Sequence, residues 1–213
     1  MPRGLQKLTI AGNNSLHFAC WNGDFEIVRL FLEHQRTLNS VDDEFKGLVG
    51  IQNSEGDTAL HYATRNGHLE IAEYLLSSGA DHTIQNNKKE TPLDCLLKKH
   101  EPQELLDLAI QKGFLKLAEL SIDAGADVNL INRDEKFTSP LSEAVENNNL
   151  AVVQSLVGRG ANIRFTASKD SNMVSMLHLA ASNCNLEMME FFIGKGLDVN
   201  ETSPPAKQRE ASC

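Results

Sequence analysis

Histidine and cysteine are the residues of this 213-residue chain best suited to act as bases, nucleophiles or metal ligands, and it contains seven histidines and four cysteines. Cys20 follows His17 by three residues, and a thiolate needs a nearby imidazole to form at neutral pH. Such a pair would make the protein a hydrolase. The sequence has no His-Glu-x-x-His zinc motif, no Cys-x-x-Cys pair and no phosphate-binding Gly-x-x-x-x-Gly-Lys-Ser/Thr loop.

The elements that would position these side chains recur at regular intervals. Leu60 precedes Gly79 by 19 residues, and a second large apolar residue follows nine residues after Leu60, at Leu69. The residues after Leu69 are apolar at helical spacing, so each interval predicts two antiparallel helices. We call the leucine that opens each interval the anchor leucine. The anchors followed by glycine at the same distance are Leu60 and Gly79, Leu106 and Gly125, Leu141 and Gly160, and Leu177 and Gly196.

The helix boundaries predicted by residue type agree with this spacing. Two residues before an anchor stands a side chain that can accept a hydrogen bond from a free amide at the start of a helix. Pro92 and Pro140 follow at the first helical position, where a missing amide hydrogen costs nothing. The predicted N-caps are Asn14, Thr58, Thr91, Ser139 and Ser175.

The segments Thr91–Leu93, Leu60–Ala63 and Leu177–Ala180 resemble the Thr-Pro-Leu-His-x-Ala signature of ankyrin repeats. The resemblance covers residues 13–200 and includes the Gly-Ala-Asp-Val-Asn segment Gly125–Asn129. It implies an all-α ankyrin-repeat solenoid of about six helix-turn-helix repeats joined by hairpin-like loops.

The resemblance divides the chain into a cap segment at 1–12, a repeat domain at 13–200 and a disordered tail at 201–213. One repeat, near residues 86–112, is irregular, because its anchor and the next are too close for a complete helix pair. It has either lost its second helix or shares the Gln103–Lys112 helix with the following repeat.

Two connections are longer than the period predicts. The segment Glu33–Gln52 is read as an enlarged loop that could act as a contact finger, and the polar segment Phe165–Met176 is read as a flexible loop.

The resemblance also implies roles for the residues that could do chemistry. His17, His61 and His178 directly follow an anchor leucine, the ankyrin position at which imidazole braces neighbouring hairpins by hydrogen bonds. Cys20 occupies a position where a small side chain packs between helices. We therefore expect no catalytic residue, no cofactor and no metal ion, and a Cys/His hydrolase remains as an alternative.

In the ankyrin fold the hairpin tips and the exposed face of each first helix line a concave groove that binds proteins. The sole tryptophan, Trp21, is either a contact residue or a cap on the exposed end of the first repeat. The protein-binding positions that we predict are Phe18, Trp21, Asn22, Ser54, Glu55, Asp57, Tyr62, Arg65, Asn66, Lys88, Glu90, Glu135, Lys136, Glu143, Glu146, Asn147, Leu179 and Ser182.

The formal net charge of −9 favours a partner with a basic surface and argues against nucleic acid, which usually requires a basic stripe. No apolar run approaches the about 20 residues needed to cross a bilayer. We expect a cytoplasmic, monomeric, noncatalytic adaptor or scaffold that binds a protein partner. The alternatives are an inhibitor of a partner enzyme and a host-directed effector of an intracellular bacterium or virus, which would act in the host cytoplasm.

Overall fold

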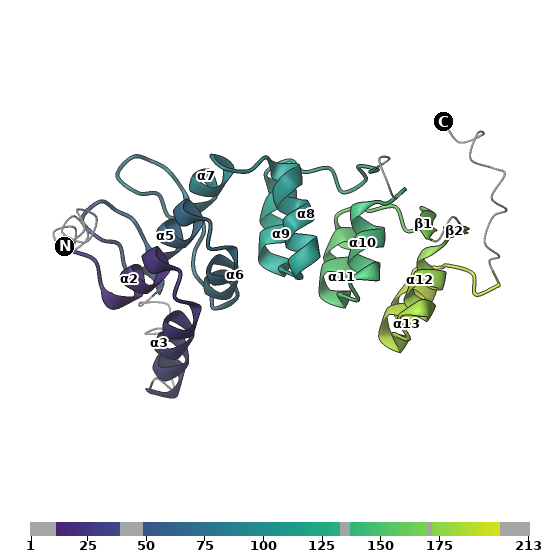
Figure 1. Cartoon of the computed structure of the whole chain (residues 1–213), viewed down its shortest axis with the longest axis horizontal. Helices are drawn as coiled ribbons and strands as arrows, with labels where there is room; N and C mark the ends of the chain where they lie inside the picture. The colour runs from purple at the N-terminus through teal and green to yellow at the C-terminus, as the bar shows by residue number, and fades with distance from the viewer. Residues whose placement is uncertain (1–11, 39–48, 133–136, 170–171, 201–213) are drawn as a thin grey trace. The chain divides into compact units, whose positions relative to one another are not determined.

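A computed structural model describes residues 12–38, 49–132, 137–169 and 172–200. The chain folds as two compact units, Met1–Glu101 and Pro102–Cys213 (Figure 1). The predicted tail and all of the predicted cap except Gly12 lie outside the described residues, so both remain predictions.

In the first unit, the first helix of each repeat packs against the first helix of the next: α2 contacts α5, and α5 contacts α7. The second helices α3 and α6 also contact each other. The helices of this unit are α2 (Ser15–Asn22), α3 (Phe25–Leu38), α5 (Ala59–Asn66), α6 (Leu69–Ser77) and α7 (Pro92–Leu97).

In the second unit the helices lie in pairs, with α8 beside α9, α10 beside α11 and α12 beside α13 (Figure 1). The pairs stack in chain order, because α8 contacts α10, α10 contacts α12, and α9 contacts α11. The helices are α8 (Pro102–Lys112), α9 (Leu115–Asp123), α10 (Pro140–Glu146), α11 (Leu150–Gly158), α12 (Met176–Ser182) and α13 (Leu186–Gly194).

The predicted N-caps start the first helices of the repeats. The side chains of Thr91 and Ser139 accept hydrogen bonds from backbone amides three residues on, and Pro92 and Pro140 follow at the first helical position. Ser175 caps α12, and its hydroxyl group lies 2.8 Å from Nδ1 of His178. Asn14 caps α2 and Thr58 caps α5, as predicted.

The predicted apolar stripes form the core of both units. The anchors Leu60 and Leu141 are 1% and 0% exposed, and Leu75 and Leu156, each fifteen residues after its anchor, are both fully buried. Because each helix pair buries these residues against its neighbours, the stacking of repeats provides the hydrophobic core. The predicted all-α ankyrin-repeat architecture is confirmed.

The irregular repeat consists of α7 alone. Only residues 98–101 separate α7 from α8, and α8 is the first helix of the following repeat because it pairs with α9. Of the two alternatives, the repeat has lost its second helix.

Both long connections contain regular structure. Helix α3 has fourteen residues, against nine in α6, so the segment predicted as a loop from Glu33 begins as helix. The segment predicted as a flexible loop before α12 contains an antiparallel hairpin of β1 (Ala167–Lys169) and β2 (Asn172–Val174). Ala167, opposite Val174, is fully buried, which ties this hairpin to the core.

Candidate protein-binding site

Trp21 and Tyr62 lie on neighbouring first helices of the first unit. Their ring centroids are 5.6 Å apart in an edge-to-face arrangement, and Trp21 keeps 36% of its surface exposed. Tyr62 is 3% exposed, and its hydroxyl group accepts a hydrogen bond from the Asn53 side chain at 3.0 Å. Tyr62 is therefore a packing residue, and its prediction as a contact residue is corrected because Trp21 and Asn53 cover it.

Asp57 is also a structural residue. The residue is 1% exposed, and its carboxylate accepts hydrogen bonds from Arg65 at 2.7 and 2.8 Å and from the amide of Asn86 at 2.8 Å. Burial alone would raise the pKa of Asp57, but the bonds from Arg65 and Asn86 hold the pKa below its ordinary value. The prediction of Asp57 as a contact residue is corrected, because this bidentate pair occupies its carboxylate.

Arg65 connects this buried pair to the surface. Its side chain is 33% exposed, and its guanidinium group lies 5.7 Å from the centroid of the Tyr62 ring.

The other predicted contact residues of the first unit differ in their partners and exposure. Glu90 forms an ion pair with Lys98 at 2.5 Å. The remaining candidates of the first unit are at least partly exposed: Phe18, Asn22, Ser54, Glu55, Asn66 and Lys88.

Two buried histidines of the first unit, His17 and His61, join consecutive repeats. The Thr58 amide donates to Nδ1 of His61 at 3.0 Å, so the ring proton is on Nε2, which donates to the Glu90 carbonyl at 3.0 Å. His17 makes the same contact with the Asp57 carbonyl at 3.1 Å. Burial lowers the pKa of both imidazoles, which stay neutral in this role.

The Cys20/His17 pair cannot act as an activated nucleophile in this fold. Cys20 is 0% exposed, and burial raises the pKa of its thiol to about 12. His17 is equally buried and is engaged by the Asp57 carbonyl. This geometry argues against the hydrolase alternative.

Two predicted contact asparagines instead connect repeats. Their side-chain amides donate to a carbonyl group of the preceding first helix, from Asn66 to Trp21 at 2.9 Å and from Asn147 to Ile110 at 3.3 Å. Asn183 makes the equivalent bond to Val145 at 2.6 Å. These amide donors serve the stacking of repeats.

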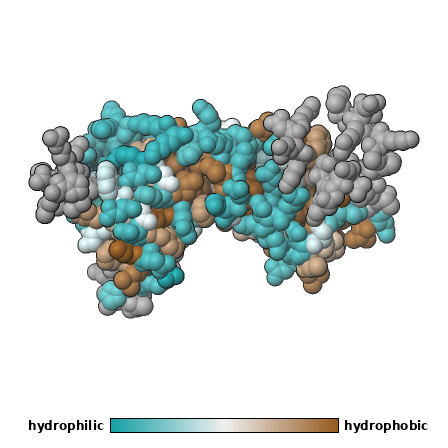
Figure 2. All heavy atoms as spheres, in the orientation of Figure 1, coloured by the Kyte–Doolittle hydropathy of each residue, from teal (hydrophilic) through white to brown (hydrophobic). Residues whose placement is uncertain are grey.

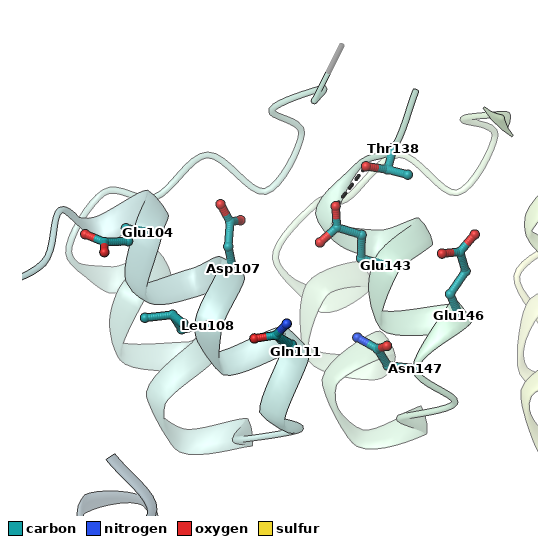
Figure 3. Close-up of a pocket in the computed structure, with 8 residues that line it drawn as sticks. All are labelled: Glu104, Asp107, Leu108, Gln111, Thr138, Glu143, Glu146 and Asn147. Atoms are coloured by element: carbon teal, nitrogen blue, oxygen red, sulfur yellow. Dashed lines mark hydrogen bonds between the residues drawn. The ribbon is translucent and has the colours of Figure 1, made fainter. Parts of the chain in front are cut away.

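In the second unit, a hollow of about 610 Å³ lies over α8 and α10 (Figure 3). Figure 3 shows the carboxylates of Asp107, Glu143 and Glu146 on the same side of the two helices. The hollow includes three predicted residues, Glu143, Glu146 and Asn147, and the five that sequence reasoning missed are Glu104, Asp107, Leu108, Gln111 and Thr138.

Two carboxylates of this hollow accept hydrogen bonds from uncharged side chains. Glu143 accepts from the Thr138 hydroxyl group at 2.8 Å, and Asp107 accepts from the Gln103 amide at 3.3 Å. Partial enclosure, with a smaller contribution from the negative charge of Glu143, raises the pKa of Asp107. Among the described residues, no lysine or arginine pairs with Asp107, Glu143 or Glu146.

The last predicted candidates lie on α12 or outside the described residues. Leu179 is 1% exposed, so its prediction as a contact residue is corrected because it belongs to the core. Ser182 is exposed, and its hydroxyl group donates to the Leu179 carbonyl at 2.8 Å. Glu135 and Lys136 lie outside the described residues.

Metal-binding groups and membrane-spanning helices are both absent from the part of the chain that the structure describes. There, no three His, Cys, Asp or Glu residues are grouped so that they could hold a metal ion. No helix among the described residues combines the length and apolar character needed to cross a membrane.

A family model described as ankyrin repeats (3 copies) matches residues 3–86 and 106–203. The chain belongs to the ankyrin-repeat family. The unmatched residues between the two stretches contain α7, the helix of the irregular repeat. Ankyrin repeats are protein–protein interaction modules, which agrees with the exposed first-helix surfaces described above.

The ankyrin-repeat chain is similar to proteins from several kinds of organism. It is 33% identical over 118 residues to an ankyrin repeat protein of Acanthamoeba polyphaga mimivirus, covering 54% of this chain and 16% of that protein. It is 33% identical over 81 residues to one of Rickettsia bellii, covering 38% and 45%. A human NAD-capped RNA hydrolase is 36% identical over 78 residues, covering 37% and 15%. The chain thus spans less than half the length of each of these relatives.

Proposed function

We propose that this protein is a noncatalytic adaptor or scaffold that binds a protein partner through the exposed faces of its first helices and the adjoining hairpin tips. Trp21 carries this proposal. It is a large, partly exposed aromatic side chain that packs against Tyr62, and the Arg65 guanidinium group contacts the same Tyr62 ring. Tryptophan and arginine are enriched among interface positions that dominate binding energy.

The direction in which Trp21 packs supports contact over capping. Its ring meets Tyr62 of the next repeat, and its carbonyl group accepts from Asn66 of that repeat. A residue that caps the outer end of the array would instead cover the face of α2 turned away from α5. The exposed part of Trp21 is therefore available to a partner.

The proposed setting is the cytoplasm, with the protein acting as a monomer until it meets its partner. Inhibition of a partner enzyme would use the same surface. A host-directed effector role is a second candidate, and the similarity to proteins of a mimivirus and of Rickettsia bellii favours it.

Photo-cross-linking in cell lysate tests the proposal. A benzophenone side chain at Asn22, beside Trp21 and exposed, should capture a specific protein, whereas the same group at exposed Glu187 on α13 should not. Trp21→Ala should weaken the Asn22 cross-link about tenfold or more, since such positions contribute 2 kcal/mol or more to binding.

The control variant is Leu186→Ala, which removes an apolar side chain of α13 that is 67% exposed. This variant should leave the Asn22 cross-link unchanged. Equal cross-linking at Asn22 and Glu187, or products that are indifferent to Trp21→Ala, would overturn the proposed surface.

A further inference from the structure

We propose that the hollow over α8 and α10 binds a basic, amphipathic segment of the partner protein, with its lysine or arginine side chains at the carboxylates and an apolar side chain at the neighbouring hairpin. This inference rests on the proposed protein-binding function and names the partner chemistry that the second unit would recognise.

The hollow continues from the helices onto the hairpin loop. A second hollow of about 490 Å³ shares Asp107, Thr138 and Glu143 with the first. Its other wall includes Leu130, which is 49% exposed, and Ile131. The two hollows together are called the α8–α10 trough. Carboxylates line both of them, and the second also contains the apolar side chains of Leu130 and Ile131.

The charges of the trough favour a cation. Four carboxylates line it, from Glu104, Asp107, Glu143 and Glu146. Burial raises the pKa of Asp107, and the negative charge of Glu143 adds to this effect, so an ammonium or guanidinium group near both carboxylates would be favoured. Among the described residues no lysine or arginine pairs with Asp107, Glu143 or Glu146, and like charges gathered in this way provide the complementarity that a basic segment requires.

The geometry favours a polypeptide cation over a metal ion or nucleic acid. Among the described residues, the carboxylates are too dispersed to form a metal-binding group. Nucleic acid would be repelled by the same negative charge. Lysine and arginine carry apolar stems beneath their charges, which suits a trough whose wall includes Leu108 and Leu130.

Fluorescence anisotropy with a labelled synthetic peptide of lysine and leucine, spaced by glycine, tests this inference. The peptide should bind the full chain more weakly as salt rises, because exposed charge pairs are screened. Replacing its lysines by glutamate should abolish binding. Replacing its leucines by serine should weaken binding severalfold without changing the salt dependence.

A pair of matched variants separates the trough from net charge. Asp107→Asn/Glu143→Gln/Glu146→Gln should weaken binding about tenfold at low salt and flatten the salt dependence. The control Glu70→Gln/Glu187→Gln/Glu190→Gln removes three exposed carboxylates that lie outside the trough, and it should change binding less than about twofold. Leu130→Ser should weaken binding severalfold at all salt concentrations.

Equal weakening by the two triple variants would overturn the inference, because net charge alone would then explain binding. Failure of the full chain to bind the lysine peptide at low salt would overturn it as well. Neither result would affect a Trp21-dependent cross-link at Asn22, so the trough and the proposed function fail on different measurements.

Discussion

In the first unit Asp57 and Glu90 lie in ion pairs with Arg65 and Lys98, whereas in the second unit Asp107 and Glu143 face each other without a cation among the described residues. The same helix-pair fold therefore supports two electrostatic arrangements. In the first, these carboxylates pair with a cation of their own repeat, and in the second, Asp107 and Glu143 have no such partner among the described residues, although Arg159 and Asp123 of the same unit pair across two repeats. Figure 2 shows that the face in view is largely hydrophilic in both units. The two units therefore differ in how their charges are paired and not in how polar this face is.

The hydrogen bonds between repeats differ in the same way. His17 and His61 connect consecutive repeats of the first unit through buried imidazole groups. At the corresponding position of α10, Ser142 donates to the carbonyl of Ser139 within its own repeat. Asparagine bonds of the Asn66 and Asn147 type occur in both units, so only the buried histidine link is particular to the first among the described repeats.

The largest expected effect tests what the units share. Leu75→Ala and Leu156→Ala remove equivalent, fully buried side chains, so each should lower the free energy of unfolding by about 2–5 kcal/mol. Urea unfolding followed by circular dichroism measures the loss. A much smaller loss in one unit would show that its helix pairs do not stack as described.

Breaking the buried ion pair should have the next largest effect. Arg65→Met leaves the Asp57 carboxylate buried with Asn86 as its remaining side-chain donor, so unfolding should become about 2–3 kcal/mol easier. Lys98→Met removes a pair with a largely exposed lysine and should leave stability within the scatter of the same urea measurement. Similar losses for both variants would remove the distinction between the buried and exposed pairs.

The two units differ in the residue that occupies one left-handed position at the end of the first helix. Seven residues after its anchor, Cys184 has φ 53° where Gly23 and Gly67 stand in the first unit. Cys184→Gly should stabilise the protein by about 1 kcal/mol, because this left-handed conformation is strained for a residue with a β-carbon. Cys184→Ala keeps the strain and should not stabilise; if both variants are equally stable in urea, the thiol group is responsible.

The smallest expected effect is a pH dependence of opposite sign in the two units. The pKa values of His17 and His61 are lower in the folded protein than the ordinary histidine value of 6.5. Below pH 6.5 the unfolded chain therefore binds more protons than the folded chain, and acidification should lower the stability of the first unit. The raised pKa of Asp107 has the opposite effect. The ionised carboxylate lowers the stability of the folded state, and this loss diminishes as the pH falls towards 3.8 and Asp107 becomes protonated. The pKa of Asp57 is lowered, so protonation of Asp57 reduces the stability of the folded protein only below about pH 4.

Hydrogen–deuterium exchange near pH 7 and near pH 5, corrected for intrinsic rates, should therefore show severalfold faster relative exchange in α5 than in α10 at the lower pH. The α10 amides serve as the internal control. An equal change in both helices would mean that the buried histidines do not set the pH response.

The helix pairs could be predicted because their determinants are local. Anchor leucines, N-caps such as Thr91 and Ser139, and prolines at the first helical position depend on residues a few places apart. The missing second helix after α7 was visible as a short distance between anchors, although the choice between loss and sharing needed the structure.

The surface could not be predicted with the same success, because exposure on a first helix depends on side chains from the neighbouring repeat. Tyr62 was expected at the surface, but Trp21 of the preceding repeat covers it. Leu179 occupies the equivalent position on α12 and is buried as well, whereas Glu143 on α10 is partly exposed. Helical periodicity alone does not distinguish these cases.

The residues of α8 were missed for a different reason. The irregular spacing before Leu106 drew attention to a possible shared helix and away from its exposed face. Counting from Leu106 as from other anchors would have placed Asp107 at the histidine position and Gln111 at the position of Trp21.

The single-helix repeat has a consequence for cooperativity. In a repeat array each repeat is stabilised by contacts with its nearest neighbours. The repeat that consists of the six-residue helix α7 has no second helix to make such contacts. Unfolding should therefore proceed in two steps, with the residues before and after this repeat melting as separate cooperative blocks. The chain would then behave in solution as two short arrays joined in one polypeptide, and one block could loosen on binding while the other stays folded.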